Sequence, residues 1–390
     1  MPSLGSLLLQ TSAADGGAET QVWLLARGLA RLGYDVCVIV VDISPGLPRE
    51  FDGVDVILRP PWQGGRGFRG QLAELIALWR VLGPLDASVI VQRAAGLWTG
   101  LVALMTSIRR RRFVFSSANL ADFDFRALAS TSKEVRLFHL GLRLATTIVV
   151  QTDEQAARCI DKFHRTPIVI RSIAEPVAAA RPRTAQAFLW IGRLVDYKRP
   201  EAFVDLARAM PEARFWMVGM PSAGDPGIAT ALEEEAREME NLKLLPARPR
   251  TELLKLYEHG VAIVNTADFE GMPNVFLEGW SRGIPALALS HDPDGLIEAN
   301  GLGGFAHGSQ QELVRLARWL WQRRDDQADL SARCRDYVGR EHSASAVITQ
   351  WIAALGLPSI CEESQASAAI AWRVNKSAPI QTSIGRSRRR

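Results

Sequence analysis

The sequence predicts an α/β protein made of two doubly wound parallel-sheet domains that face each other across a cleft. Short apolar runs alternate with helical patterns through residues 1–172, which is the pattern of repeated β-α units. Residues 173–187 are rich in proline and alanine and are predicted to be a linker. The alternation then restarts and continues through residues 188–340. Ligands of such sheets bind beyond the carboxyl ends of the strands, so the cleft is the expected site.

The first domain begins with a β-α-β unit whose turn is rich in small residues. Gly33 follows the first helical pattern and suits a helix end. The predicted strands are 6–11, 36–41, 88–91, 113–116, 147–150 and 168–170. The predicted helices are 20–32, 72–82, 97–108, one that ends at residue 144, and 153–163.

The second domain repeats the alternation and is followed by further helices. Its predicted strands are 188–191, 214–218, 242–245, 261–264 and 286–289. The predicted helices are 200–210, 230–239, 251–259, 273–282, 310–322 and 330–337, and a last helix, 344–355, lies in the segment 341–357. The periodicity is lost from residue 358, and residues 358–390 are expected to be a disordered tail.

The composition is that of an ordinary globular protein and excludes several classes. The 390 residues are 47% apolar and 23% charged, and the net charge of +4 does not indicate a nucleic-acid partner. No Cys-x-x-Cys pair is present, so the cysteines are expected to be reduced thiols of a cytosolic protein. These cysteines are Cys37, Cys159, Cys334 and Cys361.

Residues 94–108 form the longest uncharged apolar stretch, shorter than the ~20 residues that span a bilayer. No signal peptide is evident. We expect a cytoplasmic protein that is soluble or at most peripheral on a membrane.

Glycine patterns typical of two large enzyme classes are missing or misplaced. The nearest match to a dinucleotide fingerprint, from Gly301 to Ala306, runs from a helix into a strand, whereas the fingerprint needs a strand before a helix. The chain has no Gly-Lys-Ser/Thr loop, which is the signature of a P-loop kinase. The chain is therefore expected to use no nicotinamide, flavin or other cofactor.

Two glutamates eight positions apart, Glu270 and Glu278, mark the most informative stretch of the chain. An apolar run at 261–264 predicts a buried strand before them. Pro273 suits a first helical position, and Gly283 suits the left-handed residue after a helix end. Glu270 then lies in the loop and Glu278 about two turns into the helix. Between them, the free amides of the first helical turn form an anion site. This arrangement suits a ligand with hydroxyls at both ends and phosphate between them, such as a nucleotide-sugar.

The stretch resembles the Glu-x7-Glu signature of GT-B glycosyltransferases, especially the retaining enzymes of glycosyltransferase family 4 (group 1). The spacing alone fits equally an amphipathic helix with one exposed and one capping glutamate. A second stretch, residues 192–198, looks like the Gly-Arg-Leu…Lys segment of that family, in which two cations hold the donor diphosphate. The cations are Arg193 and Lys198, and the alternative is that both are solvated in the loop.

A third stretch, residues 15–19, resembles the Gly-Gly-Ala-Glu loop that these transferases place under the donor phosphate and sugar. Gly16 and Gly17 let the backbone approach a ligand closely and begin a helix with exposed amides. A plain glycine turn is the alternative.

The resemblance implies the GT-B fold, whose last helix crosses back onto the first domain, and a role for each matching residue. Glu278 would accept hydrogen bonds from the ribose hydroxyls, and Glu270 would contact the hydroxyls of the sugar. The groups that would neutralise the departing diphosphate are Arg193, Lys198 and the amides near Asn274 and Val275. GT-B enzymes do not generally need a metal ion, so none is expected.

On the acceptor side the sequence offers candidates but no general base. The loop 116–125 follows a first-domain strand and would face the cleft, yet it lacks the histidine of the His-Asp element found in many relatives. Asn119, Asp122 and Asp124 would contact the sugar or acceptor, or else cap their own loop. Arg93, which follows another predicted strand, is a further acceptor-side candidate.

Two other patterns have both a structural and a functional interpretation. His291 and Asp294 suggest a metal pair, but Asp294 precedes a helix and is expected to be its N-cap. The basic run 109–112 ends an apolar helix, where cations complement the helix dipole. The alternative is a basic rim that rests on an anionic membrane while the enzyme works on a lipid-linked acceptor.

The implied function is a retaining, metal-independent hexosyltransferase that moves a sugar from a UDP- or GDP-sugar to a hydroxyl of a saccharide or lipid-linked acceptor. The expected context is the assembly of exopolysaccharide or lipid-linked glycans. Two other classes stay open. A GT-B epimerase of nucleotide-sugars would share the donor cleft but should carry an acid and a base near the anomeric centre, and no such pair is evident. A catalytically inactive relative would bind nucleotide without turnover.

Overall fold

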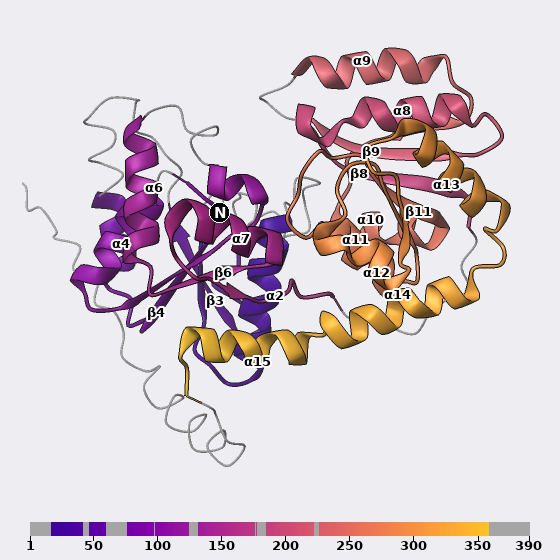
Figure 1. Ribbon diagram of the computed structural model, residues 1–390. Helices are drawn as coiled ribbons and strands as arrows, with labels where there is room; N and C mark the ends of the chain where they lie inside the picture. Colours follow the sequence, from indigo (N-terminus) through magenta and orange to yellow (C-terminus); the bar gives the residue numbers. More distant parts are fainter. Residues whose placement is uncertain are drawn as a thin grey trace, which may run out of the picture.

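The computed structural model contains two α/β domains and a C-terminal helix that links them (Figure 1). It describes residues 17–41, 47–59, 76–96, 98–124, 132–175, 177, 185–221 and 226–358. The predicted strand 6–11, most of the predicted linker and all but the first residue of the predicted tail lie outside the described residues. Within the described part, no helix is both long and apolar enough to cross a bilayer.

The first domain consists of parallel strands with helices packed against them. Its strands are β1 (Cys37–Val41), β2 (Glu50–Phe51), β3 (Val54–Arg59), β4 (Val89–Arg93), β5 (Arg112–Ser116), β6 (Thr147–Val150) and β7 (Ile168–Val169). Its helices among the described residues are α2 (Gly17–Arg31), α4 (Thr99–Ile108), α6 (Ser132–Leu144), α7 (Asp153–Phe163) and a 3-10 helix, η1 (Leu120–Asp124), and residues 76–82 are also helical. The described strands pair in the orders β1-β3-β2 and β4-β5-β6-β7. All of these pairs are parallel except β2 with β3.

The second domain is built on one parallel sheet in the order β10-β9-β8-β11-β12-β13. The strands are β8 (Ala187–Leu194), β9 (Phe215–Pro221), β10 (Leu242–Leu245), β11 (Gly260–Asn265), β12 (Ala286–Ala288) and β13 (Gly303–Phe305). The helices are α8 (Pro200–Ala209), α9 (Pro226–Arg237), α10 (Arg250–Leu256), α11 (Asn274–Ser281), α12 (Leu296–Asn300), α13 (Gln310–Gln322) and α14 (Ala328–Glu341), with short 3-10 turns η2 (Asp196–Lys198), η3 (Tyr257–His259) and η4 (Pro293–Gly295). Every residue of β11 is buried, as expected for a central strand covered by helices on both faces.

The predicted fold class is confirmed, with local corrections. The structure adds β3, which the sequence analysis missed. Pro273 is not the first helical residue: its ψ of 120° is extended, so α11 begins at Asn274. Gly283 has a φ of +72°, the left-handed conformation expected after the helix end. The predicted helix 330–337 is the middle of the longer α14.

The last helix, α15 (Ala344–Leu355), packs on the first domain although it follows the second in the chain. In Figure 1 the yellow helix runs beneath the first domain, and α14 leads to it from the second. Val347 and Trp351 share a core cluster with Leu24 of α2 and Val114 of β5. Arg112 also donates a 2.5 Å hydrogen bond to the carbonyl of Leu355 at the end of the helix. These contacts make α15 part of the first domain.

Candidate functional site

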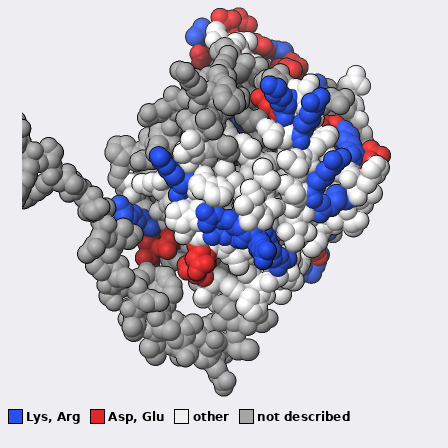
Figure 2. All heavy atoms as spheres, turned by 90° about the vertical axis from the view of Figure 1, so that its left-hand side faces the viewer, with Lys and Arg blue, Asp and Glu red and all other residues white. Residues whose placement is uncertain are grey.

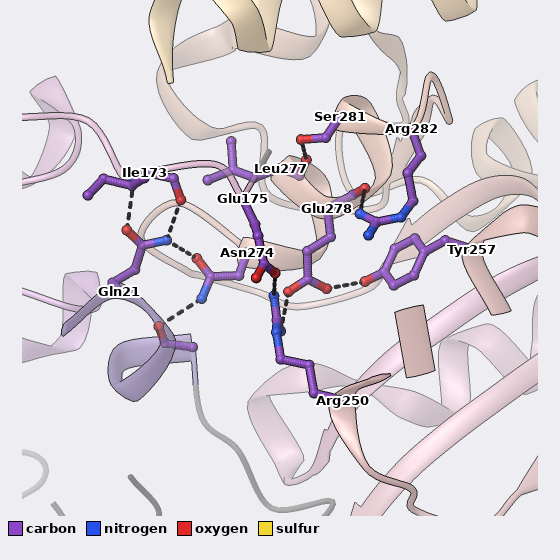
Figure 3. Close-up of polar contacts among 11 residues, drawn as sticks. Gln21, Ile173, Glu175, Arg250, Tyr257, Asn274, Leu277, Glu278, Ser281 and Arg282 are labelled. Carbon is purple, nitrogen blue, oxygen red and sulfur yellow. Dashed lines mark hydrogen bonds and ion pairs between the residues drawn. The ribbon is translucent and has the colours of Figure 1, made fainter. Parts of the chain in front are cut away.

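Glu278 lies on α11 and is held by two side chains that the sequence analysis did not single out (Figure 3). Arg250 donates a 2.6 Å hydrogen bond to Oε1, and the hydroxyl of Tyr257 donates one of 2.5 Å to Oε2. Arg250 also donates a 3.1 Å hydrogen bond to Glu175, which lies beyond the end of the first domain's sheet. Glu278 is only 8% exposed. Its carboxylate is therefore fixed in orientation before any ligand arrives.

The carboxylate of Glu278 shifts the pKa values of both of its side-chain donors. Burial by itself would lower the pKa of Arg250, but the carboxylates of Glu278 and Glu175 outweigh burial and raise that pKa. Burial and the neighbouring Glu278 carboxylate raise the pKa of Tyr257 well above its usual value, so this hydroxyl keeps its proton and remains a donor. A carboxylate has about four lone-pair positions. Two acceptor positions of Glu278 therefore remain for the hydroxyls of a ligand.

The second glutamate, Glu270, forms an ion pair with Lys198. Lys198 lies in η2 beyond β8, and Glu270 lies in the loop beyond β11. These strands are neighbours in the parallel sheet, so their carboxyl ends bring the two loops together. Glu270 is 8% exposed, whereas the side chain of Lys198 is 20% exposed and so reaches the protein surface.

Arg193 lies at the same sheet edge but is not part of this ion pair. Its guanidinium donates a 3.3 Å hydrogen bond to the hydroxyl of Tyr197, and its side chain is exposed. The ring of Tyr197 stacks on Phe269 at a centroid distance of 4.8 Å. The structure therefore places Arg193, Lys198 and Glu270 beside the cleft, with Arg193 free to turn toward a ligand from an exposed position.

The N-termini of α2 and α11 meet across the cleft through Asn274 (Figure 3). Asn274 donates a 2.8 Å hydrogen bond to the carbonyl of Gly17 and accepts one of 3.0 Å from Gln21. Gln21 in turn exchanges two hydrogen bonds with the backbone of Ile173. The amides of Asn274 and Val275, at the start of α11, have no partners within the helix, whereas that of Phe276 donates to the carbonyl of Pro273. Two helix N-termini thus face the region that the sequence analysis assigned to a diphosphate. Gly16 lies outside the described residues.

Gly271, next to Glu270, brings the second domain directly against the first. A Cβ at this position would lie 2.9 Å from both the carbonyl oxygen of Ala118 and the side-chain nitrogen of Gln151. On its other side, the carbonyl oxygen of Gly271 is 3.3 Å from Nε2 of His291. Only glycine allows this close approach, which packs the loop beside Glu270 against the first domain.

The candidates on the first-domain loop hold the loop itself. Asp122 is 5% exposed, and its carboxylate accepts hydrogen bonds from Ser117 Oγ and from three backbone amides. Asn119 accepts a 3.0 Å hydrogen bond from the amide of Ala121. Asp124 pairs with Arg158 and with Lys162. These contacts correspond to the loop-capping interpretation, and contact with an acceptor stays a prediction.

Arg93 ends β4 and lies within the electrostatic reach of Asp122. It donates a 2.9 Å hydrogen bond to Ser116 Oγ, while its Nε is buried without a partner among the described residues. Burial lowers the pKa of Arg93 to about 10, an effect that Asp122 and Glu19 oppose but do not cancel. The guanidinium is still charged at neutral pH.

Asp294 does not cap the helix that follows it, so that expectation was wrong. Asp292 does this instead, accepting hydrogen bonds from the amides of Ile297 and Glu298 at 2.9 and 3.2 Å. The carboxylate of Asp294 reaches the other domain and accepts from the first two amides of α7, at 2.9 and 3.1 Å. Asp294 has a left-handed φ of 51°, which turns its side chain away from α12. Among the described residues, no group of three or more His, Cys, Asp or Glu side chains could hold a metal ion.

Arg250, Tyr257 and Gln21 are the site residues that sequence reasoning missed. Arg250 follows β10, so its place beyond the carboxyl end of a strand was a usable signal. Tyr257 and Gln21 lie in helical segments, and nothing local distinguishes them from ordinary surface or core residues.

Two family models match the chain, one in each half. The model described as "Glycosyl transferase 4-like domain" matches residues 16–173, and "Glycosyl transferases group 1" matches residues 185–323. Among curated proteins, glycosyltransferase 1 domain-containing protein 1 of Xenopus tropicalis is 24% identical over 119 residues. The aligned stretch is 30% of this chain and only 34% of that protein.

Solved structures agree in fold at low sequence identity. Sucrose-phosphate synthase of Thermosynechococcus elongatus has a TM-score of 0.69 at 15% identity, over 88% of this chain and 95% of that one. Anabaena HepE in complex with UDP and glucose has a TM-score of 0.67 at 17% identity, over 88% and 97%. S. aureus TarM, in complex with fondaparinux, α-GlcNAc-glycerol and UDP, has a TM-score of 0.58 at 17% identity, over 68% of this chain and 55% of TarM. The two family models span most of the chain and the fold agrees, so the chain belongs to the GT-B glycosyltransferases of the family 4 (group 1) type.

Proposed function

We propose that this glycosyltransferase is a retaining hexosyltransferase that moves a sugar from a UDP- or GDP-sugar to an acceptor hydroxyl. The observation that carries the proposal is the fixed carboxylate of Glu278, which lies on the same helix whose free N-terminus faces α2. In this site Glu278 accepts hydrogen bonds from ribose hydroxyls through its two remaining acceptor positions. The first-turn amides of α11 bind the diphosphate.

Lys198 and Arg193 supply the positive charge that the departing diphosphate requires. An ammonium group has three donors, so Lys198 can keep its contact with Glu270 and also bind a phosphate oxygen. Arg193 is exposed at the same sheet edge, and its planar guanidinium group can donate hydrogen bonds to two phosphate oxygens at once. Stabilisation of the leaving group by these fixed charges is the main catalytic effect, and it is supplied by the protein without a metal ion. The anomeric carbon passes through an oxocarbenium-like state while Glu270 holds the sugar.

The contacts of Gly271 and Asn274 across the cleft support transfer over hydrolysis. They bring the second domain against Ala118 and Gly17 of the first, and so exclude water from the space beside Glu270. The UDP complexes of HepE and TarM support UDP as the donor nucleotide, and their saccharide ligands support a saccharide or lipid-linked acceptor. We place the reaction on the cytoplasmic side, in exopolysaccharide or lipid-linked glycan assembly.

The test is thermal stability of the full chain with UDP, GDP, ADP or NAD, in the presence of a chelator. A nucleotide at ~100 times its dissociation constant stabilises the folded state by about 2.7 kcal/mol. UDP or GDP should raise the melting temperature, whereas ADP and NAD should not. Release of nucleoside diphosphate from the matching nucleotide-sugar then separates an enzyme from an inactive binding protein. Stabilisation by NAD alone would contradict the proposed donor site.

We further propose that the enzyme rests on an anionic membrane through the face formed by α4, α6 and helical residues 76–82. Figure 2 shows this side of the molecule, with more Lys and Arg than Asp and Glu on the described surface. Exposed apolar side chains lie among these cations: Ile76, Trp79, Leu104, Ile108 and Leu140. Exposed basic residues of the same segments are Arg80, Arg109, Arg110, Lys133, Arg136 and Arg143. Apolar groups flanked by cations suit the interface of an anionic bilayer.

Replacing Trp79 by alanine should weaken binding to vesicles that contain anionic lipid. Trp79 is 37% exposed and lies 4.7 Å from the guanidinium of Arg109. The second domain offers a matched control: Trp319 is 44% exposed and lies 4.8 Å from the guanidinium of Arg323. In co-sedimentation with such vesicles, Trp79→Ala should bind several-fold more weakly than wild type, and Trp319→Ala should bind like wild type. Equal losses in both variants would show that another face meets the membrane.

A further inference from the structure

A small cavity in the first domain lies where four parallel strands end. It is lined by polar side chains from the ends of β4 and β5, from the segments that follow β6 and β7, and from α2. The polar lining residues are Gln21, Arg93, Ser116, Gln151, Arg171 and Ser172. Trp351 of α15 closes one side. The interior volume of about 20 Å³ has room for roughly one water molecule, and the cavity is partly open to solvent.

Two of the residues that line the cavity, Arg93 and Arg171, each have a buried guanidinium nitrogen that the described residues do not satisfy. Arg93 leaves Nε without a partner, and Arg171 leaves Nη1 without one. Arg93 otherwise donates to Ser116 Oγ, and Arg171 has its Nε 3.5 Å from Glu341. A buried donor on a charged group costs more when unsatisfied than a neutral one. The site therefore favours a ligand with negative oxygens.

The carboxylate near Arg93 does not satisfy the unpaired Nε of that residue. Asp122, the main carboxylate that acts on Arg93, already accepts hydrogen bonds from Ser117 and three backbone amides. Burial still lowers the pKa of Arg93, so the surroundings stabilise its charge less than water does. An oxyanion between Arg93 and Arg171 would supply the missing charge, and planar guanidinium groups bind carboxylate or phosphate oxygens in pairs.

The cavity is one side chain away from the donor-side residues. Gln21 lines it and donates to Asn274 on α11. Gln151 also lines it, and the side-chain nitrogen of Gln151 lies against Gly271, next to Glu270. A molecule anchored in the cavity would therefore extend toward the sugar-binding side of the cleft from the first domain.

We propose that this cavity binds an oxyanion carried by the acceptor, a carboxylate or a phosphate, and so selects an acidic acceptor. The inference rests on the proposed transferase function, because it assigns the acceptor side of that same cleft. The cavity admits only the end of the anionic group, with the rest of the acceptor lying in the open side. Arg93 and Arg171 bind the oxygens, and Ser172 and Gln151 complete the polar wall.

The test is a titration of the full chain with acetate and, separately, inorganic phosphate, at constant ionic strength and with saturating UDP to occupy the donor site. Binding is followed by calorimetry for wild type, Arg93→Gln, Arg171→Gln and the exposed control Arg110→Gln. At least one of the two anions should bind wild type and Arg110→Gln with the same affinity. The affinity of that anion for Arg93→Gln and Arg171→Gln should be at least tenfold lower. Acetate binding alone assigns a carboxylate acceptor, and phosphate binding alone a phosphorylated one.

The proposal is wrong if neither anion binds wild type, or if the Arg93→Gln and Arg171→Gln variants bind like wild type. Arg93→Lys, which keeps a charge at the buried position, covers the case in which Arg93→Gln fails to fold, and should bind more tightly than Arg171→Gln. Stabilisation by UDP is measured on the same samples. If UDP does not stabilise the protein, but anion binding is lost only in Arg93→Gln and Arg171→Gln, the assignment of the donor site is wrong and the assignment of the cavity stands.

Discussion

Replacing Glu278 by alanine should both destabilise the second domain and abolish stabilisation by UDP. Arg250 would keep its hydrogen bond to Glu175 but lose the one of 2.6 Å to the Glu278 carboxylate. The fully buried hydroxyl of Tyr257 would have no acceptor. Removing one partner of a buried ion pair typically lowers the free energy of unfolding by about 3–5 kcal/mol. The additional ~2.7 kcal/mol that UDP supplies at 100 times its dissociation constant should disappear. Urea denaturation with and without UDP measures both effects.

Two companion variants separate ligand binding from folding. Tyr257→Phe removes the hydroxyl but keeps the carboxylate, so it should lower stability by about 1–3 kcal/mol while leaving the UDP effect in place. Glu298→Ala removes an exposed glutamate of the same domain and should change stability by at most about 0.5 kcal/mol. Retention of the full UDP effect in Glu278→Ala would exclude this carboxylate from the donor site.

Replacing Lys198 by methionine should lower the rate of sugar transfer or donor hydrolysis by about 10²–10³. The methionine keeps most of the side-chain volume but removes the charge that we propose neutralises the leaving diphosphate, a loss worth about 2.7–4 kcal/mol in the transition state. The measurement is release of UDP or GDP from a panel of UDP- and GDP-sugars at saturating donor. Glu270 would also lose its ion-pair partner, so the melting temperature should be recorded beside the rate.

The neighbouring Arg199→Met provides a matched control. Arg199 is in the same loop, but its side chain is 37% exposed and pairs with the exposed Asp268 and Glu201. Surface ion pairs of this kind contribute about 0–1 kcal/mol. The rate should therefore stay within a few-fold of wild type. Equal rate losses in Arg199→Met and Lys198→Met would indicate a general effect of charge on the loop instead of a specific contact with the leaving group.

Much of the fold follows from local sequence, because buried parallel strands leave a clear signature. The run 261–264 consists of apolar residues only, and it falls inside β11, which is buried throughout. β3 (Val54–Arg59) was missed because only alternate residues are fully buried and Asp55 interrupts the apolar run. The two-residue β2 is too short to give any periodic signal.

Sequence reasoning named some residues of the candidate site but not the contacts between them. Lys198 and Glu270 come together because β8 and β11 are neighbours in the sheet, although β9 and β10 lie between them in the chain. Their pairing therefore depends on strand order, which no local pattern specifies. The bond of Arg250 to Glu175 has the same origin, since it joins a residue of the second domain to one of the predicted linker.

Asp294 illustrates how tertiary structure overrides a local cap signal. The sequence Asp-Pro-Asp-Gly before a helix offers two candidate caps, and propensity does not choose between them. The left-handed backbone at Asp294 gives the local role to Asp292 and turns Asp294 toward α7. A helix terminus of one domain is thus satisfied by a carboxylate of the other.

The place of α15 has a consequence for the order of events when the protein is made. This helix contributes Val347, Ile348 and Trp351 to the core of the first domain, yet every element of the second domain precedes it in the chain. A ribosome releases the chain from its N-terminus, and domains generally fold in that order. Here the elements of the second domain have all emerged before the first domain receives its last helix. The domain that is synthesised first is therefore the one whose core is completed last.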